Sequence, residues 1–481
     1  MSRQLMDELR EVAGAEHVHV SGDLCQYEQD WRRRIRGRAL AVVRPKNTGE
    51  VAALVKVCAR HGISIVPQGG NTGLVGGSIP DASGNQVVLQ LGRMSRVRHL
   101  DSHNLTVTVD AGVILQSLQT QMHEAGYLFP LSLGAEGSCM IGGNLATNAG
   151  GTQVLRYGNM RDLCLGLEVV TPDGDVWEGL SGLRKDNTGY DLRNLFIGSE
   201  GTLGVITAAT LKIFPLPAAV LTAWVALPSL EDGIKLLGLT QRKLGASLTG
   251  FEVMGHAGLE LVARHMPQFR IPFLDQRAPY CVLIECSDTE SEERAREALE
   301  RLLESVFDEG RIIDAVIADN LAQAEQLWHI REHITLAQTE EGPNVKHDVS
   351  IPISEIPAFA STMERQLTDA FPGLRIINFG HLGDGNLHYN VQCPQGANAL
   401  EFIAAHEGEI MDLVYRCVHD HGGSFSAEHG VGALKVGTLQ EYKSHAALRL
   451  MRAIKTAFDP HNLMNPGRVL PSCDLSHQLG G

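Results

Sequence analysis

The hydrophobic pattern of the first half of the chain changes repeatedly between helical and strand spacing. Apolar residues recur with helical spacing over 48–61, and residues 63–66 follow as a short strand-like run. Residues 86–91 and 105–109 have strand character, the second with strict polar–apolar alternation, and 116–125 again has helical spacing. This order of short elements predicts an α+β domain.

The same alternation of helix-like and strand-like segments continues from residue 221 and predicts a second α+β layer with an antiparallel sheet. A chain of 481 residues exceeds one ordinary core, so two or three domains are expected. We place them at 1–217, 218–405 and 406–481, the last a helical segment that returns to the first domain. The expected elements of the second half are strands at 224–227, 280–285 and 312–317 and helices at 231–244, 291–307 and 321–341.

Charge and hydropathy narrow the functional classes. A formal net charge of -15, with no cluster of Lys or Arg among aromatic residues, argues against nucleic-acid binding. The sequence contains no run of the ~20 apolar residues that a membrane span requires. Residues 1–20 are charged and amphipathic and lack the apolar centre of a signal peptide, so we expect a cytoplasmic protein.

The nine cysteines are an odd number and form no Cys-x-x-Cys pair. This usage argues against a disulfide framework, a zinc knuckle and an iron–sulfur cluster. We therefore expect reduced packing residues.

Three glycine-rich segments punctuate the first half: loop 1 (67–78), loop 2 (130–151) and loop 3 (198–207). Backbone N–H groups in such loops can form an anion site that holds a pyrophosphate without a cationic side chain. Loop 1 leads into another strand rather than a helix, so a Rossmann dinucleotide site is disfavoured. One such loop could be only an elaborate turn, but three suit an extended dinucleotide better than a single phosphate.

The strongest chemical signal lies in the C-terminal half. Residues 378–391 read as strand, Gly-Asp-Gly turn and strand, which can direct His381 and His388 to one side of a hairpin. Glu428 and His429 lie in a glycine-rich turn further on. A single histidine beside glycine is usually an ordinary polar residue. Two imidazoles and a carboxylate outline a divalent metal site with open positions, for which Zn²⁺ is favoured over Mn²⁺ or Fe²⁺.

The expected helix at 321–341 carries a candidate anion-binding face. Arg331 and Thr335 are one turn apart, and Lys346 is expected on the strand that follows. Alternatively, Arg331 pairs with Glu332 or Glu340 on a solvated helix surface. Two cations and a hydroxyl would suit a substrate with a second carboxylate, because an unpaired buried charge is costly.

Residues 35–215 resemble, in the order and spacing of the three loops, the FAD-binding domain of the vanillyl-alcohol oxidase and p-cresol methylhydroxylase superfamily. Some members of that superfamily attach flavin to a histidine of loop 1, which has none here, so non-covalent FAD is expected. The resemblance implies the following cofactor residues: Gly69, Gly70, Asn71, Thr72, Gly73, Leu74, Ser78, Pro130, Gly134, Ser138, Gly142, Asn144, Asn148, Glu200, Ile206 and, from the C-terminal segment, Asn465.

The chain as a whole is similar to the D-2-hydroxyglutarate dehydrogenases, within the flavin-dependent D-2-hydroxyacid dehydrogenase branch, and the motifs that carry this likeness lie in the second half and in the tail 465–468. That likeness implies zinc on His381, His388 and Glu428 and a base at His429. It also implies oxidation of D-2-hydroxyglutarate, and more weakly D-malate, to the 2-oxo acid by hydride transfer to flavin N5. Electron-transferring flavoprotein or a quinone would accept the electrons. The residues implied to hold the substrate are Arg331, Thr335, Lys346 and Asn390.

Several alternatives stay open at this point. D-lactate dehydrogenases and the glycolate oxidase flavin subunit share much of the pattern. A metal hydrolase would use the same three ligands but would have no use for three dinucleotide-type loops, and a non-catalytic flavin sensor would need neither metal nor base. The sequence also leaves a homodimer open.

Overall fold

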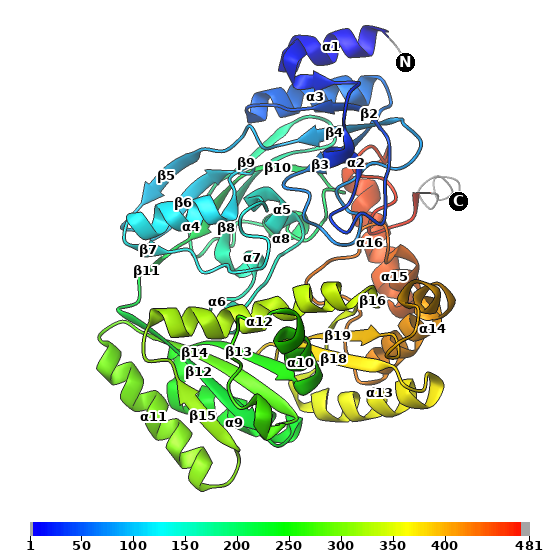
Figure 1. Ribbon diagram of the computed structural model, residues 1–481. Coiled ribbons are helices and arrows are strands. Elements are labelled where there is room, and N and C mark those ends of the chain that lie inside the picture. The colour runs from blue at the N-terminus through cyan, green and yellow to red at the C-terminus, as the bar shows by residue number, and fades with distance from the viewer. Residues whose placement is uncertain (1–2, 473–481) are drawn as a thin grey trace. The chain divides into compact units, whose positions relative to one another are not determined.

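The computed structural model describes residues 3–472, which form two compact units (Figure 1). The first unit combines the segment that ends at Gly150 with Gly158–Pro215 and the segment from Glu428 onward. The second combines Gly151–Tyr157 with Leu216–Ala427. The chain thus returns to the first unit at Glu428 rather than at the expected boundary of 406. The reason is that helix α14 (Ala399–Asp420) packs against α13 (Ile356–Ala370) of the second unit.

A small, mostly parallel sheet opens the first unit, with the order β1-β2-β4-β3. Strands β2, β4 and β3 run parallel, and helix α3 (Thr48–Arg60) connects β2 to β3. The helix begins after Asn47, whose side chain accepts a hydrogen bond from the Glu50 N–H and so satisfies a free helix-end donor. Helices α3 and α1 (Arg3–Ala13) pack on each other and share one hydrophobic core with the sheet (Figure 1). The strands are β1 (Val18–His19), β2 (Ala39–Val43), β3 (Ser64–Gln68) and β4 (Gln86–Gln90).

The second sheet of this unit is antiparallel, with the order β5-β6-β10-β8-β9. Strand β10 lies at its centre and is buried along almost its whole length. Loop 3 leads directly into β10, so the sheet fixes the end of that loop. Strands β7 and β11 form a separate two-stranded antiparallel ribbon in this unit. The elements of this part of the unit are β5 (Val97–Asp101), β6 (Thr106–Asp110), β7 (Tyr127–Leu128), β8 (Cys164–Val170), β9 (Val176–Gly179), β10 (Val205–Lys212), β11 (Phe214–Pro215), α4 (Leu115–Glu124), α5 (Ile141–Ala146), α7 (Met160–Leu163) and α8 (Arg193–Phe196). The short helix α6 (Val154–Tyr157) belongs to the second unit.

An antiparallel sheet with the order β15-β12-β14-β13-β18-β19-β16 organises the second unit, and β17 also pairs with β19. The expected α+β class with an antiparallel second sheet is therefore confirmed. Helices α10 and α12 pack on each other beside one face of this sheet, and their apolar residues share a core with alternate residues of its strands. The elements are β12 (Ala219–Leu227), β13 (Leu248–Gly255), β14 (Tyr280–Asp288), β15 (Asp314–Ile317), β16 (Asn344–Val345), β17 (Asp348–Ser350), β18 (Arg375–His381), β19 (Asn386–Gln392), α9 (Leu230–Leu244), α10 (His256–His265), α11 (Glu292–Asp308) and α12 (Leu321–Glu341).

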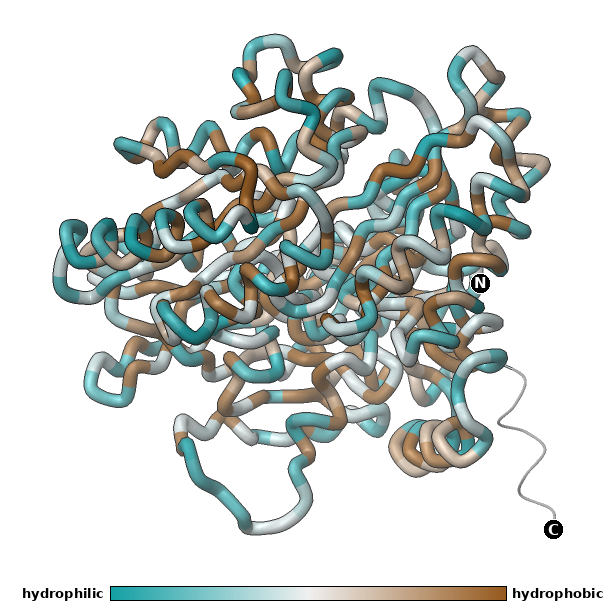
Figure 2. Tube along the Cα trace, turned by 90° about the horizontal axis from the view of Figure 1, so that it is seen from below, coloured by the Kyte–Doolittle hydropathy of each residue, from teal (hydrophilic) through white to brown (hydrophobic). Residues whose placement is uncertain are grey.

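Local sequence explains where the longest helix of this face begins and ends. The side chain of Asn320 accepts from the Gln323 N–H at the start of α12, and Gly342, with a φ of 125°, ends it. Figure 2 shows hydrophobic and hydrophilic residues interspersed along the chain. The expected helix at 321–341 is confirmed.

Two further observations concern the described residues. Between residues 3 and 472, no helix combines the length and the apolar character needed to cross a membrane. All eight cysteines of this range are free thiols, as expected from the absence of a pairing pattern. Cys473 lies outside the described residues.

Candidate active site

Strands β18 and β19 form the hairpin that carries both candidate histidines. His381 pairs with Asn386, so His388, two residues further along β19, lies on the same face of the hairpin as His381. The two imidazole centroids are 5.7 Å apart. The turn needs glycine, because a Cβ at Gly385 (φ 85°) would lie 2.4 Å from the backbone oxygen of Ile351. The predicted hairpin with both histidines on one side is observed.

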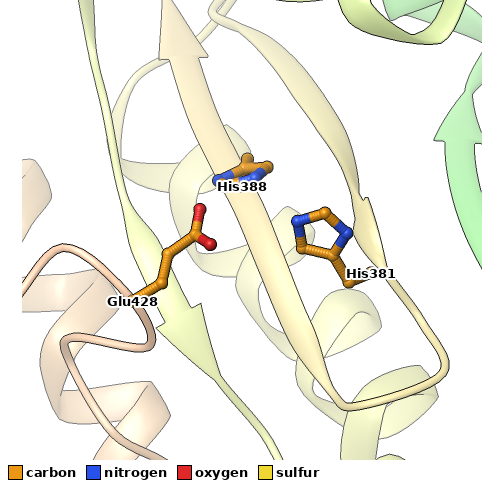
Figure 3. A group of neighbouring side chains, drawn as sticks. All are labelled: His381, His388 and Glu428. Atoms are coloured by element: carbon orange, nitrogen blue, oxygen red, sulfur yellow. The ribbon is translucent and has the colours of Figure 1, made fainter. Parts of the chain in front are cut away.

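Glu428 completes a group of three candidate metal ligands (Figure 3). It directly follows Ala427, whose N–H donates to Oδ2 of Asp348 at 3.2 Å. Its carboxylate points toward the two imidazoles in Figure 3, and the ligand atoms of His381, His388 and Glu428 all lie within 4.8 Å of one another. Two imidazoles and one carboxylate are a donor set that fits zinc and leaves a coordination position open.

A second group, Asp348, Glu428 and His429, has the same spread of ligand atoms and competes for the same carboxylate. However, both carboxylate oxygens of Asp348 already accept hydrogen bonds within the protein. Oδ1 accepts from Nδ2 of Asn386 at 3.0 Å, and Oδ2 accepts from the Ala427 N–H. Zinc also favours nitrogen ligands over a set dominated by carboxylates. The group with two histidines is therefore the better candidate.

The turn that carries His429 is held by a buried carboxylate of loop 3. Glu200 accepts the backbone N–H groups of Val431 and Gly432, both at 2.7 Å. Burial raises the pKa of Glu200, and these two hydrogen bonds oppose the shift. His429 keeps 21% of its side-chain surface exposed, and its Nε2 lies 3.8 Å from Oε1 of Glu428. The predicted base thus lies beside a predicted ligand on a turn with fixed backbone.

Arg331 does not pair with Glu332 or Glu340 as the alternative interpretation held. Its Nε donates to Oε2 of Glu252 on β13 at 2.8 Å, and the side chains are 8% and 1% exposed. The other oxygen of Glu252, Oε1, lies 2.6 Å from Nδ1 of His381. Burial raises the pKa of Glu252, but His381 and Arg331 outweigh that effect and lower it to about 2.

Glu252 was not among the residues predicted from the sequence, although its sequence context indicates a buried carboxylate. The carboxylate stands in the strand LTGFEVMG, where every residue is buried. A glutamate in such a strand requires a charged or hydrogen-bonding partner, because burial of an isolated carboxylate is costly. That requirement could have marked Glu252 as a candidate, but not its partners.

The other predicted substrate residues differ in exposure. Thr335 is exposed on α12. Lys346 is half-buried, and it lies between β16 and β17 rather than on a strand, because the two short strands are interrupted there. Asn390 is buried on β19, where its Oδ1 accepts from the His347 N–H and its Nδ2 donates to Oε1 of Gln338, both at 3.0 Å. Both polar atoms of the Asn390 amide therefore make hydrogen bonds within the second unit.

Loops 1 and 2, both in the first unit, are in contact. A Cβ at Gly70 would lie 1.9 Å from the backbone oxygen of Ser138, so only glycine allows this approach. Asn71 has a φ of 54°, its Nδ2 donates to the backbone oxygen of Gln29 at 2.8 Å, and its Oδ1 accepts from the Ser78 hydroxyl at 2.8 Å. Asn71 and Ser78 thus hold the shape of loop 1.

Asn465 joins loop 1 to loop 3. Its Nδ2 donates to the backbone oxygens of Gly77 and Glu200, each at 2.8 Å. Its Oδ1 is buried and has no hydrogen-bond partner among the described residues. A bound ligand with an N–H or O–H donor would satisfy this atom, so the residues of the first unit fit a cofactor such as FAD.

The remaining predicted cofactor residues lie in the same loops or at their ends. Gly142 packs so closely that a Cβ would lie 2.7 Å from the Cβ of Ala111. Asn148 has a φ of 51°, and its Oδ1 accepts from the Arg161 N–H at 2.9 Å. Asn144 is buried, and its Nδ2 donates to Sγ of Cys139 at 3.6 Å. The others are Gly69, Thr72, Gly73, Leu74, Pro130, Gly134 and Ile206, the last at the start of β10.

Substitution Gly70→Ala is expected to abolish stable flavin binding, because the added methyl group forces loops 1 and 2 apart. The matched control is Gly137→Ala in loop 2, where the new Cβ would meet only Oε1 of Gln116 at 3.4 Å. The visible flavin absorbance per protein after gel filtration measures the effect. Full flavin content in Gly70→Ala would contradict a role of this contact in cofactor binding.

Comparisons with known proteins agree with this arrangement. A model of the FAD binding domain matches residues 39–179, and a model of the C-terminal domain of FAD linked oxidases matches residues 216–469. The chain is 39% identical to mitochondrial D-2-hydroxyglutarate dehydrogenase of Arabidopsis thaliana, over 92% of this chain and 77% of the relative. It is 38% identical, over 95% of this chain and 86% of the relative, to a mitochondrial protein of Schizosaccharomyces pombe with a provisional D-lactate dehydrogenase name.

The names of these eukaryotic relatives contradict the expected cytoplasmic location, because they are mitochondrial. The expectation rested on the lack of an apolar signal-peptide centre and of a membrane span. Neither observation separates the cytosol from the mitochondrion, since mitochondrial transit peptides are amphipathic rather than apolar.

Structural comparison supports the same fold. The structure of p-cresol methylhydroxylase with substrate bound superimposes with a TM-score of 0.75, at 17% identity, over 97% of this chain and 96% of that one. At this identity the likeness concerns the fold alone. The family models and the two relatives carry the assignment further: the chain belongs to the FAD-linked oxidases, in the family that includes the D-2-hydroxyglutarate dehydrogenases, and it is an FAD-dependent oxidoreductase.

Proposed function

We propose that the protein oxidises D-2-hydroxyglutarate, and more weakly D-malate, to the corresponding 2-oxo acid with the help of a divalent metal. The observation that carries the proposal is the group His381, His388 and Glu428, with ligand atoms within 4.8 Å of one another and His429 next in sequence. A metal hydrolase could use the same ligands, but it would not need an FAD-binding domain.

In this proposal His381, His388 and Glu428 would hold zinc, which would supply Lewis-acid stabilisation of the substrate 2-hydroxyl. His429 would accept the hydroxyl proton, because imidazole is the side chain that most often acts as a general base. The three loops would bind FAD non-covalently, and FAD would supply the hydride acceptor, N5. The chain itself contributes alignment of the reacting groups.

The position of Arg331 changes what its charge implies about the substrate. Its charge is already compensated by Glu252, so a monocarboxylate would not leave this cation unpaired. The guanidinium can still bind a carboxylate through the donors that Glu252 does not use. Support for a second substrate carboxylate therefore rests on relatives named D-2-hydroxyglutarate dehydrogenases.

A D-lactate dehydrogenase is the second candidate. Two observations favour it: the compensated charge of Arg331 and the provisional name of the relative from Schizosaccharomyces pombe. The compensated charge of Arg331 is equally compatible with a glycolate oxidase flavin subunit.

Steady-state turnover of a panel of D- and L-2-hydroxy acids with an artificial dye as electron acceptor tests the proposal. We expect the highest kcat/KM for D-2-hydroxyglutarate, a lower value for D-malate, and little turnover of the L-isomers. A higher kcat/KM for D-lactate would reject the dicarboxylate assignment in favour of the second candidate.

The variant Lys346→Ala is expected to raise KM for D-2-hydroxyglutarate far more than KM for D-lactate. Only the diacid has a distal carboxylate, and that carboxylate would lose its contact with the Lys346 ammonium. The exposed Lys443 provides the control for a general loss of charge, and Lys443→Ala should change neither KM. An equal rise in KM for both substrates would mean that Lys346 does not bind the distal carboxylate.

For the electrons that leave the flavin, we propose electron-transferring flavoprotein or a quinone as acceptor. Reoxidation of substrate-reduced enzyme, followed in parallel with each of the two acceptors, would distinguish them.

Release of all yellow colour on acid precipitation is the expected sign of non-covalent FAD.

A further inference from the structure

Glu252 occupies the centre of the second unit's sheet, between two groups that the proposed function uses. Strand β13 pairs with β18 in a register that places Glu252 opposite His381. Helix α12 brings Arg331 to the same carboxylate, and the Arg331 guanidinium carbon lies 5.0 Å from the centroid of Phe379. One fully buried carboxylate thus contacts a predicted metal ligand with one oxygen and a predicted substrate-binding cation with the other.

The contact with His381 decides which imidazole nitrogen faces the proposed metal. Oε2 of Glu252 is already paired with the permanently charged Arg331, which keeps Glu252 an acceptor, so Nδ1 of His381 is the donor in the 2.6 Å contact with Oε1. In a neutral imidazole the lone pair then resides on Nε2. Histidines that bind metals commonly donate their other N–H to a carboxylate, which fixes the ring orientation and raises ligand basicity.

The contact with Arg331 fixes the plane of its guanidinium. Nε donates to Oε2 of Glu252 at 2.8 Å, and Nη2 lies 2.7 Å from the same oxygen in the ion pair. The opposite edge, with Nη1, is not used by this pair. Glu252 therefore sets the direction in which Arg331 can present its remaining donors, in addition to balancing its charge.

Resting on the proposed function, we infer that Glu252 is a positioning residue that sets the zinc-binding tautomer of His381 and the orientation of Arg331 together. Through this one carboxylate, metal affinity and substrate affinity depend on the same residue. A buried ion pair with a purely structural role would affect stability but neither affinity.

The test is the zinc affinity of Glu252→Gln, measured on FAD-loaded protein by competition with a chromophoric chelator. Glutamine keeps the shape but removes the charge and one acceptor. Loss of such a supporting carboxylate is expected to weaken zinc binding about 10- to 100-fold. A second readout is KM for D-2-hydroxyglutarate at saturating zinc, which should rise because the Arg331 guanidinium loses its anchor.

Glu285 on β14 provides a matched control. It is also a buried glutamate on a neighbouring strand, and in the described structure it accepts from the Thr249 hydroxyl at 2.8 Å and from Nε1 of Trp328 at 2.9 Å. Glu285→Gln should leave zinc affinity and KM unchanged. A similar loss in both variants would mean that burial of any carboxylate here, rather than the contact with His381, sets the affinity.

Glu252→Gln leaves Arg331 as a buried cation without its carboxylate and could prevent folding. The double variant Glu252→Gln with Arg331→Met removes that cation, and Arg331→Met alone is its reference. If zinc affinity falls in the double variant but not in Arg331→Met, Glu252 acts directly on His381. Unchanged affinity in both, while the wild type binds zinc, overturns the inference alone. Failure of the wild type to bind zinc overturns the metal part of the proposed function as well.

Discussion

Replacement of His429 by alanine is expected to slow the reduction of bound flavin by about 10²- to 10⁴-fold, the effect of losing a general base. The side chain lies beside a predicted metal ligand and is partly exposed, as a base that meets substrate must be. Its backbone is held through the contacts of Glu200 with Val431 and Gly432, so the truncation should leave the turn in place. Rapid mixing of oxidised enzyme with D-2-hydroxyglutarate, followed by flavin absorbance, measures the rate.

The FAD content and the zinc content of the His429→Ala variant are measured in the same preparation. FAD and zinc should both stay at the wild-type level, and the exposed His445, replaced by alanine, should have no effect on the rate. Loss of zinc along with the rate would instead identify His429 as a ligand, as the group of Asp348, Glu428 and His429 allows. An unchanged rate would return His429 to a structural role.

Removal of the metal is expected to abolish turnover while the protein stays yellow. The three proposed ligands lie on the β18–β19 hairpin and at Glu428, whereas the cofactor loops are formed by other residues, so chelation should not release FAD. Without a Lewis acid, the several kcal/mol that it contributes to ionisation of the hydroxyl are lost. Activity and flavin absorbance are measured before and after dialysis against a chelator.

Readdition of one equivalent of Zn²⁺ should restore turnover. His388→Ala should reproduce the inactive state without chelator, because it removes one of the three proposed ligands. Metal binding should also weaken as the pH falls, because a protonated imidazole cannot bind a metal. Full activity of a demonstrably metal-free preparation would end the metal hypothesis.

Local features of the sequence were sufficient for the hairpin, the long helix and the glycine-rich loops. Turn residues and strand alternation act over a few positions, so residues 378–391 predict two histidines on one face of a hairpin. The helix at 321–341 is bounded in the same local way by its end residues Asn320 and Gly342. The FAD-binding class followed from the order of the three loops, which is also a property of the linear sequence.

Only the tertiary structure decided which charges meet. Glu252 and His381 are 129 positions apart, and Glu252 and Arg331 are 79 apart. Strand order and register bring them together, and no local pattern encodes a pairing at that separation. The nearby Glu332 and Glu340 were the obvious partners of Arg331 in the sequence, yet the helix turns Arg331 toward the core. A buried cation there is stable only with a buried carboxylate, which β13 supplies.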